Sequence, residues 1–266
     1  MIQTHGAKLA RLGAQRQVFS EHGYTMTAHL LQAGGQLSLG GMASLFHQPI
    51  CPFSRKVRLV LGEKKFAVEF VEERPWQRRL DFLMLNPSGE VPVLVGDAGT
   101  IAGHYAITEW LEEKGGALQL MPSGGLARAE VRRLIAWFDD KFYGEVGRLI
   151  TYEKIDRRFM GDSAGGGGPD METVRTGLHN LGLHMEYLTY LLEQRSWLAG
   201  EDITIADLTA GAHLSCLDFT GDVPWQSWPV VRDWYARIKS RPSFRPLLAD
   251  TVAGMRPPAY YVDLDF

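Results

Sequence analysis

A cysteine lies where a helix is expected to begin, in the segment HQPICPFSRKVRLVL at residues 47–61. Pro52 suits the first position of a helix, because its missing N–H would be unpaired there in any case. A thiol at a helix N-terminus lies near unpaired amide groups, whose partial positive charge favours the thiolate. We therefore expect Cys51 to have a lowered pKa, with Arg55 and Lys56 adding to the effect, and to be suited to conjugating or exchanging thiols.

Two other interpretations of this segment stay open. Ser54 could polarise a bound thiol in place of the cysteine, or Cys51 could be a small buried residue at a turn. The segment has no second cysteine, which excludes a dithiol mechanism. His47 and Cys51 lack the companion pair that a zinc site needs, so we expect no metal site and interpret His47 as the end of a strand.

Composition narrows the range of partners. The 266 residues carry a formal net charge of -3 and are 45% hydrophobic, which is typical of a globular protein and gives no electrostatic reason to expect nucleic acid or an anionic membrane. The two cysteines, Cys51 and Cys216, form no disulfide framework, which favours a reducing cytoplasm. No apolar run approaches the length of a membrane span.

The first half of the chain reads as a small α/β layer. Strands are expected at residues 44–47 and 67–73. A hairpin is expected from residues 91–95 and 96–102. The stretch SRKVRLVLGEKK is an expected helix with an apolar face, and with Arg55 and Arg58 directed outward. Further helices are expected at 79–86 and 104–116. The predicted order is β-α-β-α-β-β-α.

The second half is expected to be all-helical. Apolar residues recur at three- and four-residue steps from Val131 to Val146 and again from Val174 to Leu192. ITIADLTAGAHLSCL opens with Thr204 and Asp207 at capping-box spacing and is apolar nearly all round, so it predicts a central buried helix.

These patterns divide the chain at changes of composition. We expect a flexible extension at 1–41, a thioredoxin-like domain at 42–117, an all-helical domain at 126–250 and a tail at 251–266. The extension has weak periodicity and no signal-peptide pattern, and we expect the physiological start at Met26 or Met42.

CPFSRKVRLVL, NPSGEVPVLV and WLAGEDITIADL, in this order, resemble motifs of the glutathione S-transferase superfamily. The resemblance covers about residues 44–248. It implies a thioredoxin-like domain followed by a helical bundle, a cis peptide before Pro92, and a glutathione site around Cys51, Val91 and Pro92.

One departure from the family pattern concerns how glutathione is held. In the family, a Glu/Gln-Ser pair binds the γ-glutamyl end, and this sequence has Gly103 and His104 there. Hydrogen bonds to charged groups contribute about 1.5–3 kcal/mol each, and about 1.4 kcal/mol is a tenfold change in affinity. We therefore expect a vestigial site that binds glutathione poorly, and no cofactor.

A narrower resemblance, carried mainly by the tail RPPAYYVDLDF, is to the transferase-like division proteins of alphaproteobacteria that bind the tubulin-like protein FtsZ. It implies a non-enzymatic homodimer, cytoplasmic at the division site, that binds FtsZ polymers and changes their curvature or bundling. The alternative is a glutathione transferase or thiol reductase that uses Cys51.

Partner-binding residues are expected in a loop and at the end of the chain. Trp76 lies among arginines in EERPWQRRL, where it could be a lid, a partner anchor or a ring folded back onto the sheet. The tail has apolar and acidic residues that need a cover, either the helical domain or a partner, and we expect a mixture in which the tail is partly packed and its tip is part of a partner surface. The tail residues that we expect at a partner surface are Tyr260, Tyr261, Asp263, Leu264, Asp265 and Phe266.

Overall fold

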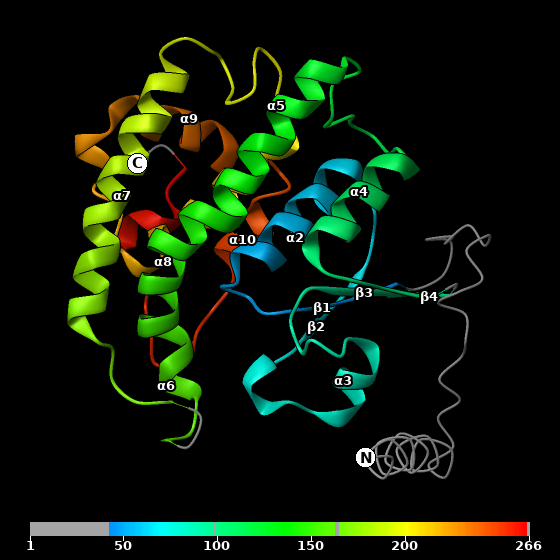
Figure 1. The fold of residues 1–266 in the computed structure, drawn as a ribbon, viewed down its shortest axis with the longest axis vertical. Helices are drawn as coiled ribbons and strands as arrows, with labels where there is room; N and C mark the ends of the chain where they lie inside the picture. The colour runs from blue at the N-terminus through cyan, green and yellow to red at the C-terminus, as the bar shows by residue number, and fades with distance from the viewer. Residues whose placement is uncertain (1–42, 98, 163–164, 265–266) are drawn as a thin grey trace, which may run out of the picture.

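A computed structural model describes residues 43–97, 99–162 and 165–264 of the chain. The expected extension over residues 1–41 lies outside this part, as do Asp265 and Phe266 of the tail. Figure 1 shows the chain passing from a small sheet with its covering helices into a larger group of helices. The predicted fold class, an α/β part followed by an all-helical part, is confirmed.

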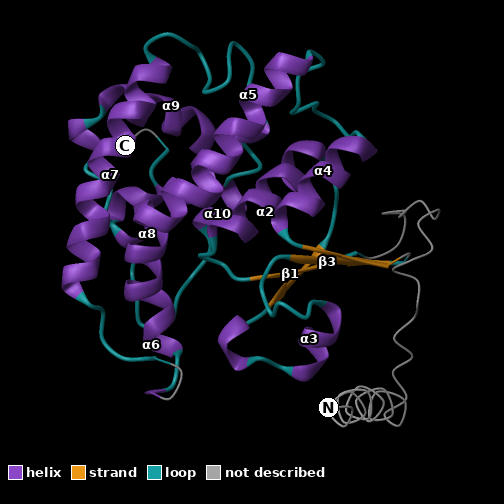
Figure 2. Cartoon of the chain, viewed as in Figure 1, coloured by secondary structure: helices purple, strands orange, loops and turns teal. Residues whose placement is uncertain are grey.

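The α/β part has the predicted order of elements. They are β1 (Ser44–His47), α2 (Pro52–Lys64), β2 (Glu69–Glu72), the 3-10 turn η2 (Pro75–Gln77), α3 (Leu80–Leu85), β3 (Val93–Gly96), β4 (Gly99–Ala102) and α4 (His104–Lys114). The sheet order is β2-β1-β3-β4, with β1 parallel to β2, and with β1–β3 and β3–β4 antiparallel. Helices α2 and α4 cover one face of the sheet and α3 lies across the other (Figure 2).

Strand β1 fixes where the reactive-looking segment lies. Leu45 is buried opposite Phe70 of β2 and Leu94 of β3, so β1 is held on both sides. His47 ends the strand, as predicted, and a short turn leads to Cys51, the residue that caps α2. The Cys51 thiol therefore lies at the edge of the sheet where β1 has its carboxyl end.

The remaining chain is helical, as predicted. Its elements are α5 (Gly125–Ala136), η3 (Trp137–Asp156), α6 (Arg157–Phe159), α7 (Met171–Leu192), α8 (Ile205–Thr220), the turn η5 (Trp225–Ser227), α9 (Pro229–Lys239), α10 (Arg245–Leu248) and the turn η6 (Ala259–Val262). The turns of η3 are wider than α-helical turns, of the π type. Within the described residues, no helix combines the length and apolar character needed to cross a membrane.

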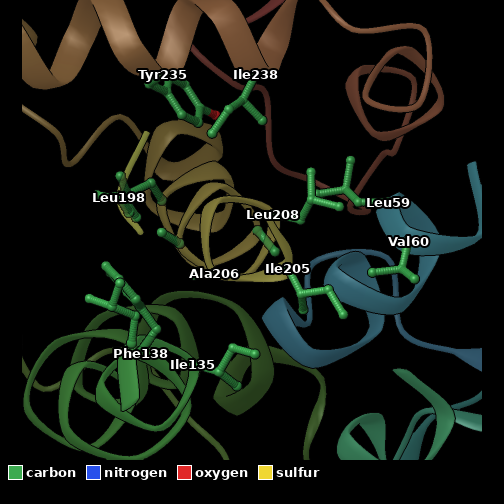
Figure 3. Close-up of a cluster of buried hydrophobic side chains, with 14 of the residues drawn as sticks. Leu59, Val60, Ile135, Phe138, Leu198, Ile205, Ala206, Leu208, Tyr235 and Ile238 are labelled. Carbon is green, nitrogen blue, oxygen red and sulfur yellow. The ribbon is translucent and has the colours of Figure 1, made fainter. Parts of the chain in front are cut away.

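Helix α8 is the centre of the core, as its all-round apolar sequence predicts. The capping box is present: the Thr204 hydroxyl accepts from the Ala206 amide, and Asp207 accepts from the Thr204 amide at 2.9 Å. The same aspartate accepts from the Trp234 indole of α9 at 3.1 Å. Figure 3 shows side chains of α2, α5, η3 and α9 converging on this helix, so α8 joins the two halves of the chain.

The prediction that Arg55 and Arg58 point outward is wrong. Both are buried, and both bind Asp250, which follows α10. Arg55 also donates to the Pro49 carbonyl at 2.8 Å and to the Ser215 hydroxyl at 2.8 Å. Helix α2 lies between the sheet and α8, so the side of the helix that carries these arginines does not face water. The two guanidinium groups are accommodated there because each is paired with a carboxylate and hydrogen-bonded.

Candidate functional site

The structure brings four of the five residues of the expected glutathione site to one cleft, together with Trp76. Cys51, Trp76, Val91, Gly103 and His104 all line an open cleft of about 570 Å³, within the range of small-molecule sites. They come from the start of α2, from η2, from the segment before β3, and from the start of α4. The Val91–Pro92 peptide is cis, as the family resemblance implies, and the Pro92 carbonyl accepts from the Gly103 amide at 3.0 Å.

Cys51 does not have the properties predicted for it. Burial raises the pKa of its thiol, and this outweighs the favourable hydrogen bonds from Ser54; Asp156 nearby raises it further. Arg55 does not help, because it is directed into the core. The thiol is therefore protonated at neutral pH, and the predicted thiolate is wrong.

Lys56 is also turned away from the thiol. It is buried and forms an ion pair of 2.5 Å with Asp139 of η3, while His213 of α8 lies 3.2 Å from the same carboxylate. Although burial opposes its charge, these neighbours hold the pKa of Asp139 below its usual range. This cluster joins the two halves of the chain beneath the cleft, and sequence spacing gave no sign of it, since its members are far apart in the chain.

Ser54 is not placed to polarise a bound thiol. It is completely buried, and its hydroxyl accepts from the Gln48 amide at 3.3 Å. It is absent from the cleft wall. Of the alternatives for this segment, a cysteine at a turn that belongs to the fold agrees best with the structure.

The start of α4 offers little to an anionic ligand. Gly103 caps the helix with φ +91°, in the region that favours glycine, and has no side chain to contribute. His104 stacks on Phe53 with ring centroids 4.5 Å apart, and its Nδ1 lies 3.2 Å from Lys56 Nζ. Burial, together with the charge of Lys56, lowers the pKa of His104 to about 4, so the ring is neutral at pH 7.

Trp76 is part of the cleft wall. Its ring is half-buried and stacks on Phe159 of α6, with centroids 6.4 Å apart and planes inclined by 16°. The stacking bridges the loop after β2 to the helical part. Of the interpretations left open for this residue, a ring packed against the chain itself fits best, although the packing partner is a helix and not the sheet.

Other cleft residues were not anticipated from the sequence. Tyr143, Tyr152 and Asp156 of η3 also line the cleft. The sequence signal for these cleft residues is weak: polar residues interrupt the apolar pattern along one side of η3. Among the described residues, no cluster of three or more His, Cys, Asp or Glu side chains is arranged to hold a metal ion.

Comparison with known proteins agrees with this geometry. Family models described as the N-terminal and C-terminal domains of glutathione S-transferase match residues 50–114 and 170–242. FtsZ-localized protein A of Caulobacter vibrioides is 42% identical to the chain over 227 residues, covering 84% of this chain and 98% of that protein. The chain belongs to the glutathione S-transferase superfamily.

Two solved structures share the whole fold. A protein titled a glutathione S-transferase, from Rhodospirillum rubrum, is 47% identical with a TM-score of 0.81. FzlA from C. crescentus is 42% identical with a TM-score of 0.80. Each alignment covers 85% of this chain and all of the other. Similar proteins in the superfamily thus include one that is called a glutathione S-transferase and one that is named for FtsZ.

The tail divides into a packed part and an exposed part. Tyr261 is completely buried, with its ring edge-on to Phe219 of α8 at 5.5 Å and its hydroxyl donating to the Leu247 carbonyl. Its predicted place at a partner surface is therefore wrong, because the helical part already covers it. Tyr260 and Leu264 are partly buried, whereas Val262 is 61% exposed.

Proposed function

We propose that the chain is a non-enzymatic adaptor, a homodimer in the cytoplasm that binds FtsZ polymers at the division site and alters their curvature or bundling. The observation that carries the proposal is the 42% identity to a protein named FtsZ-localized protein A, over 98% of that protein. Because the likeness spans nearly the whole of that protein, it favours a shared partner over a shared fold only.

The cleft chemistry supports a role without catalysis. A transferase needs a thiolate-stabilising group and a grip on an anionic tripeptide. Here burial keeps the Cys51 thiol protonated, and the cleft wall has no lysine or arginine side chain among the described residues that form it. Asp156 and Glu90 make the wall negative at neutral pH, which opposes the carboxylates of glutathione.

The exposed tip of the tail is the partner surface that we favour. Tyr261 fastens the tail to the helical part, so Val262, Asp263 and Leu264 are presented at a defined place, with little ordering entropy left to lose on binding. In a dimer, two such tips can engage two subunits of one filament or two filaments, which raises avidity without a new type of contact.

The test must spare Tyr261, since deleting the whole tail would also disturb the core. We would replace the two apolar tip residues in a Val262→Ala/Leu264→Ala variant and measure co-sedimentation with polymerised FtsZ. We expect at least about tenfold weaker binding, as for a hot spot of about 1.4 kcal/mol or more, with an unchanged unfolding midpoint.

Leu183→Ala is the matched control, because Leu183 on α7 is 58% exposed, close to the 61% of Val262. It should co-sediment as the parent protein does. Parent-like binding by the tip variant would contradict the role of the tail, and a parent protein that fails to sediment with FtsZ would contradict the proposed function itself.

One observation favours a second candidate, a glutathione transferase. The relative from Rhodospirillum rubrum that is titled a glutathione S-transferase is 47% identical over its whole length. Calorimetry with glutathione separates the candidates: an enzyme should bind at millimolar concentration or better and lose conjugation in Cys51→Ala. An adaptor should show neither glutathione binding nor conjugation activity.

A further inference from the structure

The cleft has an unusual charge pattern for a site inherited from a glutathione-binding fold. Its wall contains two carboxylates, Asp156 and Glu90, and His104 is neutral at pH 7. Within the described part of the chain, none of the residues that form the wall is a lysine or an arginine. A cleft of this kind repels anions and attracts cations, since opposite charges interact strongly near low-dielectric walls.

Asp156 differs from most other buried or partly buried carboxylates of the chain. Asp139, Asp218 and Asp250 each form an ion pair with a buried lysine or arginine. Asp156 has one hydrogen bond, in which Gln48 Nε2 donates to its Oδ1 at 2.6 Å, and the described residues place no cation on it. A partly buried carboxylate without a counter-ion is unfavourable unless something else supplies the charge.

Aromatic rings make up much of the remaining wall. Phe53, Trp76, Tyr143 and Tyr152 all line the cleft. Tyr143 lies edge-on to Phe53 with centroids 4.7 Å apart, and Trp76 is fixed by its stacking on Phe159. Rings held in place around a carboxylate are a favourable setting for an organic cation, because each ring face carries partial negative charge.

We propose that this cleft binds an organic cation, an alkylammonium or guanidinium group, with Asp156 as its counter-ion and the aromatic residues as its walls. The group has two sources with the same chemistry: a free amine, or the lysine or arginine side chain of a partner protein. The proposal rests on the cleft and not on FtsZ binding, so the two can fail separately.

The experiment uses the full chain and three probes. Spermidine represents a free polyamine, Nα-acetyl-arginine amide represents a protein side chain, and Nα-acetyl-citrulline amide is the uncharged counterpart of the arginine probe. Binding is followed by calorimetry and by the fluorescence of the protein. We expect saturable binding of at least one cationic probe, at least about tenfold weaker binding of the citrulline probe, and weakening by salt.

Two variants assign the binding to the cleft. Asp156→Asn keeps an oxygen that can accept from Gln48 but removes the charge, and it should weaken cation binding at least about tenfold. Asp202→Asn, an exposed carboxylate before α8 that is not in the cleft wall, should bind as the parent protein does.

The outcomes separate the two sources and leave the proposal open to refutation. Preference for spermidine indicates a free amine, and preference for the arginine probe indicates a protein side chain; either supports the site. The proposal is overturned if neither cation binds below about 1 mM, if citrulline binds equally well, or if Asp156→Asn binds as the parent does.

Discussion

Removing the charge of Asp156 should make the free protein more stable. Its carboxylate is partly buried in the cleft wall and receives one hydrogen bond, from Gln48. Burial raises the pKa of Asp156 from 3.8 to about 6, and the bond from Gln48 offsets only part of this. The folded state therefore holds an ionised group that would be better solvated in the unfolded chain, and Asp156→Asn should relieve this.

The magnitude follows from the two pKa values. The difference between 3.8 and about 6 corresponds to about 3 kcal/mol, at about 1.4 kcal/mol for each pKa unit. Because the side chain is partly exposed, solvent screening reduces this, and we expect a gain of about 1–2 kcal/mol in the free energy of unfolding at pH 7.

The direction of the pKa shift of Asp156 determines how the gain in stability of Asp156→Asn depends on pH. Between pH 3.8 and about 6 the folded state binds more protons at Asp156 than the unfolded state does. The destabilisation by this group is therefore complete above about pH 6 and disappears as the pH falls toward 3.8. Asp156→Asn should accordingly be more stable than the parent at pH 7 and nearly equal to it at about pH 4.

Urea denaturation at the two pH values is the assay, with Asp202→Asn as the control that should change nothing at either pH. A variant less stable than the parent at pH 7 would refute the reasoning. An equal gain at both pH values would also refute it, because the effect would then come from packing and not from charge.

Three further predictions concern residues whose surroundings the structure defines. Tyr261→Ala should lower the free energy of unfolding by about 3–5 kcal/mol, as for a buried aromatic ring, whereas Val262→Ala should change it by less than about 0.5 kcal/mol; urea denaturation of both tests whether the tail is part of the core. Iodoacetamide should alkylate Cys51 more slowly than free cysteine at pH 7.5, with a rate inflection above that of an ordinary thiol, since burial raises its pKa; an inflection below about pH 8 would contradict this. Burial lowers the pKa of both His47 and His104 to about 4, so these residues should make stability fall as the pH drops from about 6.5 to 4, most clearly in the Asp156→Asn background, and a flat profile there would count against it.

Local sequence rules predicted what local interactions decide. The capping box at Thr204 and Asp207, the hairpin of β3 and β4, and the all-round burial of α8 follow from residues close together in the chain, and all are present. The cis peptide at Pro92 came from the family resemblance and is also confirmed. These features establish the fold and the position of the cleft.

The errors share a physical origin in contacts between distant segments. Arg55 was expected outside because a charged side chain on a helix usually faces water, yet Asp250, far along the chain, supplies a buried partner. The prediction for Cys51 considers only its helix terminus, but the pKa of a thiol also depends on burial, and Cys51 packs against the cluster of Phe82, Val91 and Val93. Tyr261 was assigned to a partner because nothing local could show that Phe219 and Leu247 would cover it.

If the chain is the non-enzymatic adaptor that we propose, two separate features would keep it from catalysis: the raised pKa of Cys51 and the lack of a side chain at Gly103. Asp156 contributes to the raised pKa of Cys51, but burial is the larger cause. Removing that carboxylate would therefore lower the barrier to forming a thiolate without producing one at neutral pH. Gly103 would still offer no side chain to the ligand, and His104 would remain held against Phe53. Because the thiolate and the grip on glutathione depend on separate residues, we expect no single substitution to convert the proposed adaptor into a transferase, whereas Asp156→Asn alone should weaken the proposed cation site at least about tenfold.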